Sequence, residues 1–311
     1  MTESYSKEVR YATVFAVLTA LILVCVKSVA WWFTGSVSML ASITDSLLDL
    51  LASFMNMLIL RFALMPADHN HSFGHGKAES LASLAQAAFI SGSAIFLLLQ
   101  GIHRLSSPQT LTNTGLGIGV TIFSILLTAL LVGYQGKVIR NTQSPAIKAD
   151  RLHYQTDLLM NIAILISLLL SLFGFLYADA IFALFIALYI LFSAGKMVFE
   201  SVQLLLDVAL PIEEVKQIET IALADPRVIG LHDIRTRRAG AIRFIQLHLE
   251  LGDELSFIEA HDITDDVEKR LLKAFPLSDI MIHQEPTSIV KAEGKHNCRY
   301  NQSGSDQILV K

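Results

Sequence analysis

Long apolar runs joined by short polar segments fill the chain up to about residue 204. A helix needs about 20 predominantly apolar residues to cross a bilayer, and each of these runs is long enough. The pattern therefore predicts an all-α membrane domain with six spans. The predicted spans cover residues 11–33, 39–65, 80–102, 114–136, 150–174 and 178–204.

From about residue 207 the long runs give way to shorter periods. Residues 211–223 and 256–275 carry the apolar stripe of amphipathic helices. Residues 228–237, 241–251 and 278–284 have the alternation and composition of strands. The order αββαβ predicts a small, metallochaperone-like α+β domain in which a layer of helices covers a short sheet.

These patterns divide the chain into three parts. We expect a six-helix membrane domain at residues 1–206 and a soluble C-terminal domain at residues 207–290. Residues 291–311 are rich in Lys, Gly, Ser, Asn and Gln and have no apolar period, which predicts a disordered tail.

Composition supports a membrane protein with a soluble part. Only 17% of the 311 residues are charged and 53% are hydrophobic, whereas a globular domain has about 25% charged residues. The charge is unevenly shared, since residues 207–290 hold nine Lys or Arg against sixteen Asp or Glu. An acidic domain of this kind is a poor partner for nucleic acid and a plausible partner for cations.

The basic residues predict the orientation in the membrane. The segments that flank the predicted spans on one side of the membrane contain most of the Lys and Arg residues. The segments on the opposite side contain Arg104 and few other basic residues. The positive-inside rule then places both termini and the C-terminal domain in the cytoplasm. The basic residues on the cytoplasmic side are Lys7, Arg10, Arg61, Lys77, Lys137, Arg140 and Lys148.

Two carboxylates interrupt the second predicted span. Asp45 and Asp49 are four residues apart, so a helix places them on one face, one turn apart. A charged group at bilayer depth costs at least about 2.5 kcal/mol, and a like charge nearby adds repulsion. The pair therefore indicates a positive partner, either protons or a metal ion. The alternative is that both acids line a water-filled cavity.

The fifth predicted span repeats this arrangement with His153 and Asp157, which are also one helical turn apart. If the two helices face each other, three carboxylates and one imidazole converge, a donor set that suits Zn²⁺ or Cd²⁺. A histidine in a span can instead serve only as a hydrogen-bonding group between helices. Three further polar residues lack a partner at ligand spacing, and we expect them to pack or to line a cavity: Lys27, Asn56 and Gln86.

Two more groups have potential metal ligands. The loop after the second span holds Asp68, His71 and His75, whose spacing fits one metal ion or an exposed loop that simply titrates. The C-terminal domain contains four histidines and a glutamate spread over several elements. Spacing alone leaves open whether they bind metal or lie scattered on the surface: His232, His248, His261, His283 and Glu285.

Taken together, these motifs resemble the cation diffusion facilitator family of metal transporters. The similarity extends from about residue 8 to residue 290 and is most specific at residues 42–49, 66–79 and 153–157. It implies a homodimer in the bacterial inner membrane, surrounded by lipid, that exports Zn²⁺ in exchange for protons. Cd²⁺ and Fe²⁺ are further candidate substrates.

The resemblance also implies three metal sites. The transport site would use Asp45, Asp49, His153 and Asp157, and a loop site would use Asp68, His71 and His75. A binuclear site in the dimerisation domain would use His232, His248, His261, His283 and Glu285. At the last position this chain departs from the family pattern, which has an aspartate.

Other functions predict different features. An intramembrane protease would need a His-Glu-x-x-His or a Gly-x-Gly-Asp motif, and the sequence has neither, so we expect a transporter rather than an enzyme. A membrane metal sensor would bind metal without moving it. A passive channel would move it without regard to a pH gradient.

Overall fold

The computed structural model describes residues 3–34, 37–106, 115–172 and 177–292. The chain divides into two compact units, Met1–Leu205 and Leu206–Lys311, which we call the membrane unit and the C-terminal unit. Residues 293–311, which make up most of the predicted disordered tail, lie outside the described residues.

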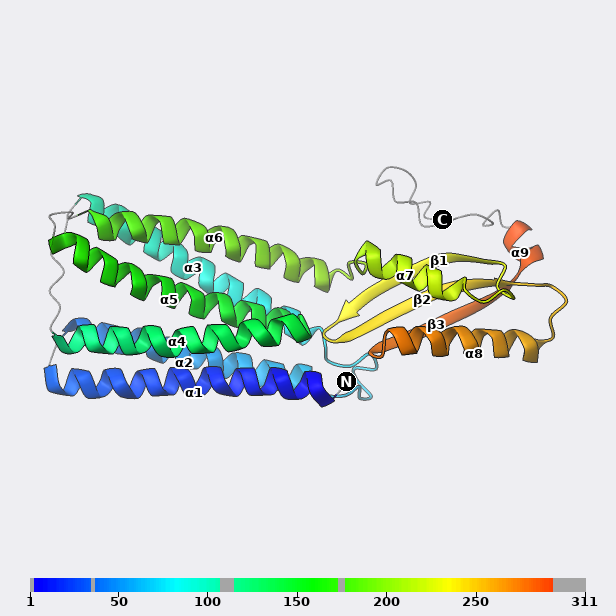
Figure 1. Ribbon diagram of the computed structural model, residues 1–311, viewed down its shortest axis with the longest axis horizontal. Helices are drawn as coiled ribbons and strands as arrows, with labels where there is room; N and C mark the ends of the chain where they lie inside the picture. The colour runs from blue at the N-terminus through cyan, green and yellow to red at the C-terminus, as the bar shows by residue number, and fades with distance from the viewer. Residues whose placement is uncertain (1–2, 35–36, 107–114, 173–176, 293–311) are drawn as a thin grey trace. The chain divides into compact units, whose positions relative to one another are not determined.

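The membrane unit is a bundle of long helices that run side by side (Figure 1). Each predicted span corresponds to one helix, but the helices continue past the apolar segments because polar residues at their ends also adopt helical structure. The helices are α1 (Glu3–Thr34), α2 (Val37–Ala63), α3 (Ala78–Ser106), α4 (Gly115–Thr142), α5 (Pro145–Leu172) and α6 (Ala178–Leu205).

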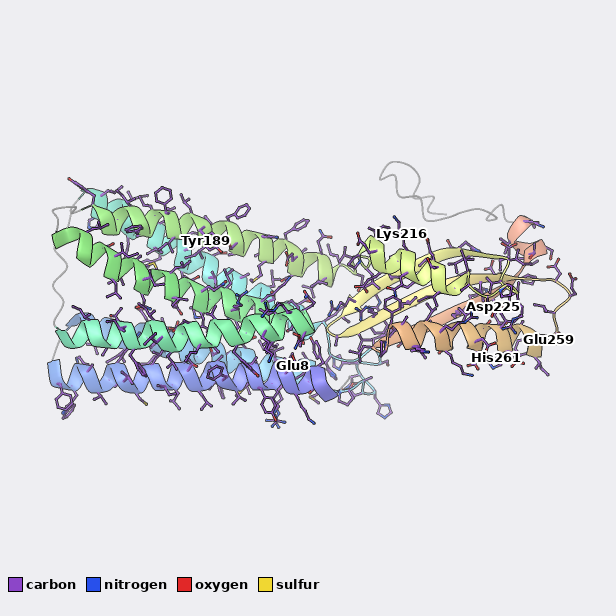
Figure 2. The ribbon with its side chains drawn as sticks, viewed as in Figure 1. Glu8, Tyr189, Lys216, Asp225, Glu259 and His261 are labelled. Atoms are coloured by element: carbon purple, nitrogen blue, oxygen red, sulfur yellow. The ribbon has the colours of Figure 1, made fainter. Side chains whose placement is uncertain are left out.

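Most of these helices have the length and composition of membrane spans. Among the described residues, α1, α2, α3, α4 and α6 are long and apolar enough to cross a bilayer. Helix α5 has 28 residues, and charged residues in its first half lower its hydropathy. Large apolar side chains such as Phe192 and Phe185 cover the outside of the bundle, where lipid would contact them, and Tyr189 on α6 is also exposed (Figure 2).

Small side chains allow α3 and α6 to pack closely. A β-carbon added at Gly101 would come within 3.0 Å of the Leu184 side chain, so the glycine makes room for it. The Ser201 hydroxyl donates to Ser83 Oγ at 2.9 Å, which adds a polar tie inside the pair. The alanines of this interface are fully buried: Ala87, Ala94, Ala187 and Ala194.

The C-terminal unit has the predicted αββαβ order. Strands β1 and β2 are antiparallel and β2 and β3 are parallel, in the order β1-β2-β3. A short helix that the sequence pattern did not predict, α9, follows β3. The elements are α7 (Ile212–Ala222), β1 (Gly230–Ala239), β2 (Ile242–Leu251), α8 (Phe257–Ala274), β3 (Ser278–Pro286) and α9 (Thr287–Ala292).

One face of the sheet packs against α7 and α8 to form an apolar core. Helix α8 begins with a capping box in which Ser256 and Glu259 satisfy each other's backbone N–H groups. Side chains of β2 alternate between the core face and the opposite face, as in any strand. The core includes Ile218, Ile245, Leu247, Leu249, Ile263, Val267 and Leu271.

A buried aspartate holds the segment after α7 against α8 (Figure 2). Asp225 accepts hydrogen bonds from Arg227 Nη2 at 2.8 Å and from Arg270 Nη2 at 2.5 Å. These hydrogen bonds, chiefly those from Arg227, hold the pKa of Asp225 well below its usual value. Because the folded-state pKa is depressed, this carboxylate stabilises the fold above the unfolded pKa of about 4, and the stabilisation is lost as the pH falls below it.

We expect Asp225→Ala to lower the unfolding free energy of the C-terminal unit by about 2 kcal/mol, because two arginines lose a buried acceptor. Chemical denaturation of the full-length protein at pH 7 measures the change. The control is Asp265→Ala, which removes an exposed partner of Lys269 and should cost less than about 1 kcal/mol. Equal effects of the two substitutions, or a difference that persists at acid pH, would contradict this role.

Candidate metal centres

Three side chains from two helices meet inside the membrane unit. The ligand atoms of Asp49 on α2 and of His153 and Asp157 on α5 all lie within 4.8 Å of one another. His153 Nε2 lies 3.0 Å from Asp49 Oδ1 and 4.0 Å from Asp157 Oδ2. The His153 side chain is only 8% exposed, so the cluster sits against the interior of the bundle. One imidazole and two carboxylates can hold a divalent cation.

Helix packing brings these two elements together. The Tyr154 hydroxyl lies 2.7 Å from Ser53 Oγ on α2 and donates to the Ala16 carbonyl on α1 at 3.2 Å. Tyr154 is buried, and it follows His153 directly in the sequence. These contacts hold the turn of α5 that carries His153 against α2.

Asp45, the fourth ligand expected from the sequence, does not join this group. It lies on α2 one turn before Asp49 and is exposed. The sequence did not predict that Lys27, a cation on α1, would lie close to this site. Its Nζ donates a hydrogen bond to Ser46 Oγ at 2.7 Å, and Ser46 lies between Asp45 and Asp49 in the sequence. Lys27 interacts electrostatically with Asp49, Asp157 and Asp45. The sequence did contain a feature that could have predicted this contact. A lysine inside an apolar span is energetically unfavourable unless a carboxylate lies near it.

The loop between α2 and α3 forms a second cluster. The ligand atoms of Asp68, His71 and His75 lie within 4.8 Å of one another, with His75 Nε2 3.3 Å from Asp68 Oδ2. The segment is a tight loop in which Gly74 has a φ of +78°. His75 Nδ1 lies 3.2 Å from the Pro66 carbonyl oxygen, an arrangement that turns Nε2 toward Asp68, where both could bind one ion.

Hydrogen bonds keep the loop carboxylate ionised. The backbone N–H groups of His71 and Asn70 donate to Asp68 Oδ1 at 2.7 and 2.9 Å. These bonds, chiefly that from His71, lower the pKa of Asp68. A carboxylate must be deprotonated to bind a metal, so the loop presents Asp68 in the state that an ion requires.

The third cluster lies on the C-terminal sheet. His232, His248 and His283 occupy one row, because His232 pairs with His248 and His248 pairs with His283 across the strands. Glu285 bridges the row: its Oε2 lies 3.1 Å from His232 Nε2 and its Oε1 lies 2.7 Å from His248 Nδ1. Leu247 and Leu249 face the core, so His248 points to the sheet face opposite the helices.

The other two predicted ligands of this unit lie less close. His283 Nε2 is 3.5 Å from Glu285 Oε1, and the His283 side chain is 63% exposed. His261 lies on α8, is exposed, and does not join the group formed by His232, His248 and Glu285 (Figure 2).

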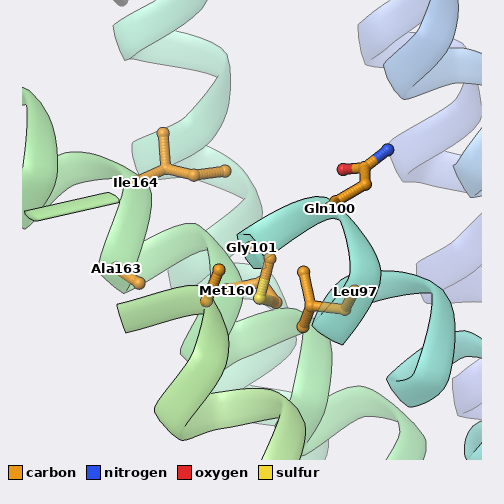
Figure 3. A pocket seen from close by; sticks show the side chains of 7 residues that line it. Leu97, Gln100, Gly101, Met160, Ala163 and Ile164 are labelled. Atoms are coloured by element: carbon orange, nitrogen blue, oxygen red, sulfur yellow. The ribbon is translucent and has the colours of Figure 1, made fainter. Parts of the chain in front are cut away.

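A pocket elsewhere in the membrane unit offers little metal chemistry. It lies between α3, α5 and α6, and Gln100 is the polar side chain in its lining (Figure 3). None of its lining side chains is ionisable. They are Leu97, Gln100, Gly101, Met160, Ala163, Ile164 and Ala183.

Comparisons with known proteins cover nearly the whole chain. The cation efflux transmembrane domain family matches residues 13–206, and the cation efflux protein cytoplasmic domain family matches residues 210–287. The chain is 53% identical over 297 residues to the cation-efflux pump FieF of Escherichia coli O1:K1 / APEC, covering 96% of this chain and 99% of that one. The same figures hold for FieF of Escherichia coli strain K12 / DH10B.

A solved structure also matches the C-terminal part. It is the metal-bound C-terminal domain of the CzcD transporter from Thermotoga maritima, at 30% identity. The match covers 24% of this chain and 88% of that one, with a TM-score of 0.24.

Proposed function

The chain belongs to the cation efflux family, also called the cation diffusion facilitator family, and on that premise we propose that it is a proton-coupled antiporter that exports Zn²⁺ from the cytoplasm. Family membership makes it a multi-pass membrane transporter of metal cations and not an enzyme. The proposal adds the ion, the coupling to protons and the direction.

The observation that carries the proposal is the convergence of Asp49, His153 and Asp157 inside the membrane unit. An imidazole nitrogen with carboxylate oxygens suits Zn²⁺, and also Cd²⁺ or Fe²⁺. These groups bind the metal only when deprotonated, so metal and protons compete for the same atoms. Protons entering from the more acidic side would displace the metal, and metal from the cytoplasm would displace the protons.

Alternating access would follow from a movement of helices around this fixed site. We propose that Asp45, one turn from Asp49 on the same face of α2, completes a four-ligand set when the ion binds. Lys27 would offset part of the negative charge before the ion arrives.

The other two clusters would support transport. The proposed loop site uses Asp68, His71 and His75. The proposed cytoplasmic site uses the histidine row and Glu285, with His261 completing a second ion position, and would strengthen a homodimer of C-terminal units. The helix bundle would lie in the inner membrane of a bacterium. Both termini would face the cytoplasm, as the basic residues in the segments between the helices predict.

Zn²⁺ uptake into proteoliposomes with an imposed pH gradient tests the proposal. Because protons leaving the vesicle would drive Zn²⁺ in, an acid interior is expected to raise the initial rate and an alkaline interior to lower it. A rate indifferent to the gradient would identify a channel, and stoichiometric binding with no uptake would identify a sensor.

A further inference from the structure

An arginine on α5 lies inside the membrane unit without a carboxylate partner among the described residues. Arg151 follows the first residue of α5 by six positions, a distance of about 9 Å along the helix axis. Its guanidinium contacts α4 at Val132 and Gly136, and both residues belong to the candidate membrane span Gly117–Thr142. A cation in such a segment is energetically unfavourable and normally has an anionic partner.

Contacts with α4 fix the position of this guanidinium. Helices α4 and α5 run side by side (Figure 1). Arg151 Nε donates a hydrogen bond to the Val132 carbonyl oxygen at 3.2 Å. A β-carbon added at Gly136 would lie 3.3 Å from both Cζ and Nη2 of Arg151. The absence of a side chain at Gly136 therefore gives the guanidinium room to lie against the backbone of α4.

The rest of the guanidinium is available to a ligand. The hydrogen bond to Val132 uses the N–H group of Nε. The donors on the two terminal nitrogens have no acceptor among the residues that the structure describes, and the side chain is partly exposed. A planar group with paired donors, held in one position, matches the geometry of phosphate and carboxylate oxygens.

A second arginine lies one helical turn further along α4. Arg140 is four residues after Gly136, so it lies on the same face of the helix, nearer to the end of α4. Its side chain is exposed, and no carboxylate in the described part of the chain pairs with it. Arg151 and Arg140 therefore place two unpaired positive charges near one end of the membrane span.

We propose that Arg151 and Arg140 form a binding site for the phosphate of a membrane phospholipid. Charge and position both favour this ligand, because a lipid phosphate is anionic and lies at the depth to which arginines near the end of a span extend. The site goes beyond the proposed transport function and does not depend on which ion is carried. Because Arg151 is two residues before His153, a bound lipid would also help to hold the turn that carries this proposed ligand.

Native mass spectrometry of the full-length protein in detergent tests the site, with phosphatidylglycerol as the probe. We expect Arg151→Met to weaken phosphatidylglycerol binding about tenfold, the effect of losing a charged hydrogen-bonding group. Binding of a diacylglycerol with the same acyl chains should not change, because it has no phosphate. The substitution removes a charge from a membrane segment, so it is not expected to unfold the protein.

Two further variants complete the experiment. Gly136→Ala keeps both charges, but its β-carbon would displace the guanidinium, so phosphatidylglycerol binding should weaken by less than in Arg151→Met. Alanine favours a helix more than glycine does, which keeps this variant folded. Lys196→Gln is the matched control, because it removes an exposed positive charge on α6 of the same unit, and it should bind phosphatidylglycerol as the wild type does.

The same spectra contain the results that would overturn the proposal. Equal binding of phosphatidylglycerol by the wild type and Arg151→Met would exclude Arg151 from a lipid site. Inorganic phosphate that binds the wild type as tightly as phosphatidylglycerol would assign the site to a free anion. Loss of a dimer in Arg151→Met with unchanged lipid binding would assign the arginine to a carboxylate of a second copy of the chain.

Discussion

Asp49→Ala is expected to lower Zn²⁺ transport by about a hundredfold or more while the protein remains folded. Asp49 is the ligand that we propose α2 contributes, and its Oδ1 lies 3.0 Å from His153 Nε2. Removing a group that only supports a ligand typically costs ten- to a hundredfold in metal affinity or activity, so removing a ligand costs at least as much. The helix itself loses a charge that is unfavourable in a membrane, which favours folding.

Zn²⁺ uptake by reconstituted protein measures this effect. Glu200→Ala is the matched control, since Glu200 is a carboxylate of the same unit that pairs with Lys148 on the exposed side of α6. The control should transport normally. If Asp49→Ala also transported normally, the cluster of Asp49, His153 and Asp157 would not be the transport site.

Glu285→Ala is expected to abolish most of the stabilisation that Zn²⁺ gives to the C-terminal unit. The two carboxylate oxygens of Glu285 contact His232 and His248. The substitution would therefore remove the ligand that lies next to both histidines. An ion at about 100 times its Kd stabilises a folded unit by about 2.7 kcal/mol. For a unit of this size such a gain raises the unfolding temperature by roughly 10–20 °C.

Calorimetry of the full-length protein with Zn²⁺ and with a chelator measures that shift. Glu254→Ala changes an exposed glutamate of the same unit and should retain the whole shift. Glu285→Asp keeps a carboxylate and should retain most of it. A full shift in Glu285→Ala would show that Zn²⁺ stabilises the protein at another site.

Apolar run length and helical spacing predicted much of this architecture. Six runs gave six helices, because bilayer thickness sets a length that composition reveals. The four-residue spacing of Asp45 and Asp49 correctly assigns them to one helix face. Spacing within α2 does not determine, however, which of the two lies level with His153 on α5. Which of the two meets His153 depends on how α2 packs on α5, through contacts such as that of Ser53 with Tyr154.

The C-terminal unit shows a similar limit. Alternation predicts the strands, yet the alignment of His232, His248 and His283 depends on strand register and on an irregularity between His232 and Arg235. A shift by one residue would send these side chains to the other face.

One intramembrane site, formed around Asp49, His153 and Asp157, is proposed to exchange a metal ion for protons. The most direct test records Zn²⁺ uptake and internal pH together in the same proteoliposomes, for the wild type and for Asp49→Ala. Wild-type uptake of Zn²⁺ is expected to be accompanied by outward movement of protons, and both are expected to be lost in the variant. Zn²⁺ uptake without proton movement would contradict this exchange.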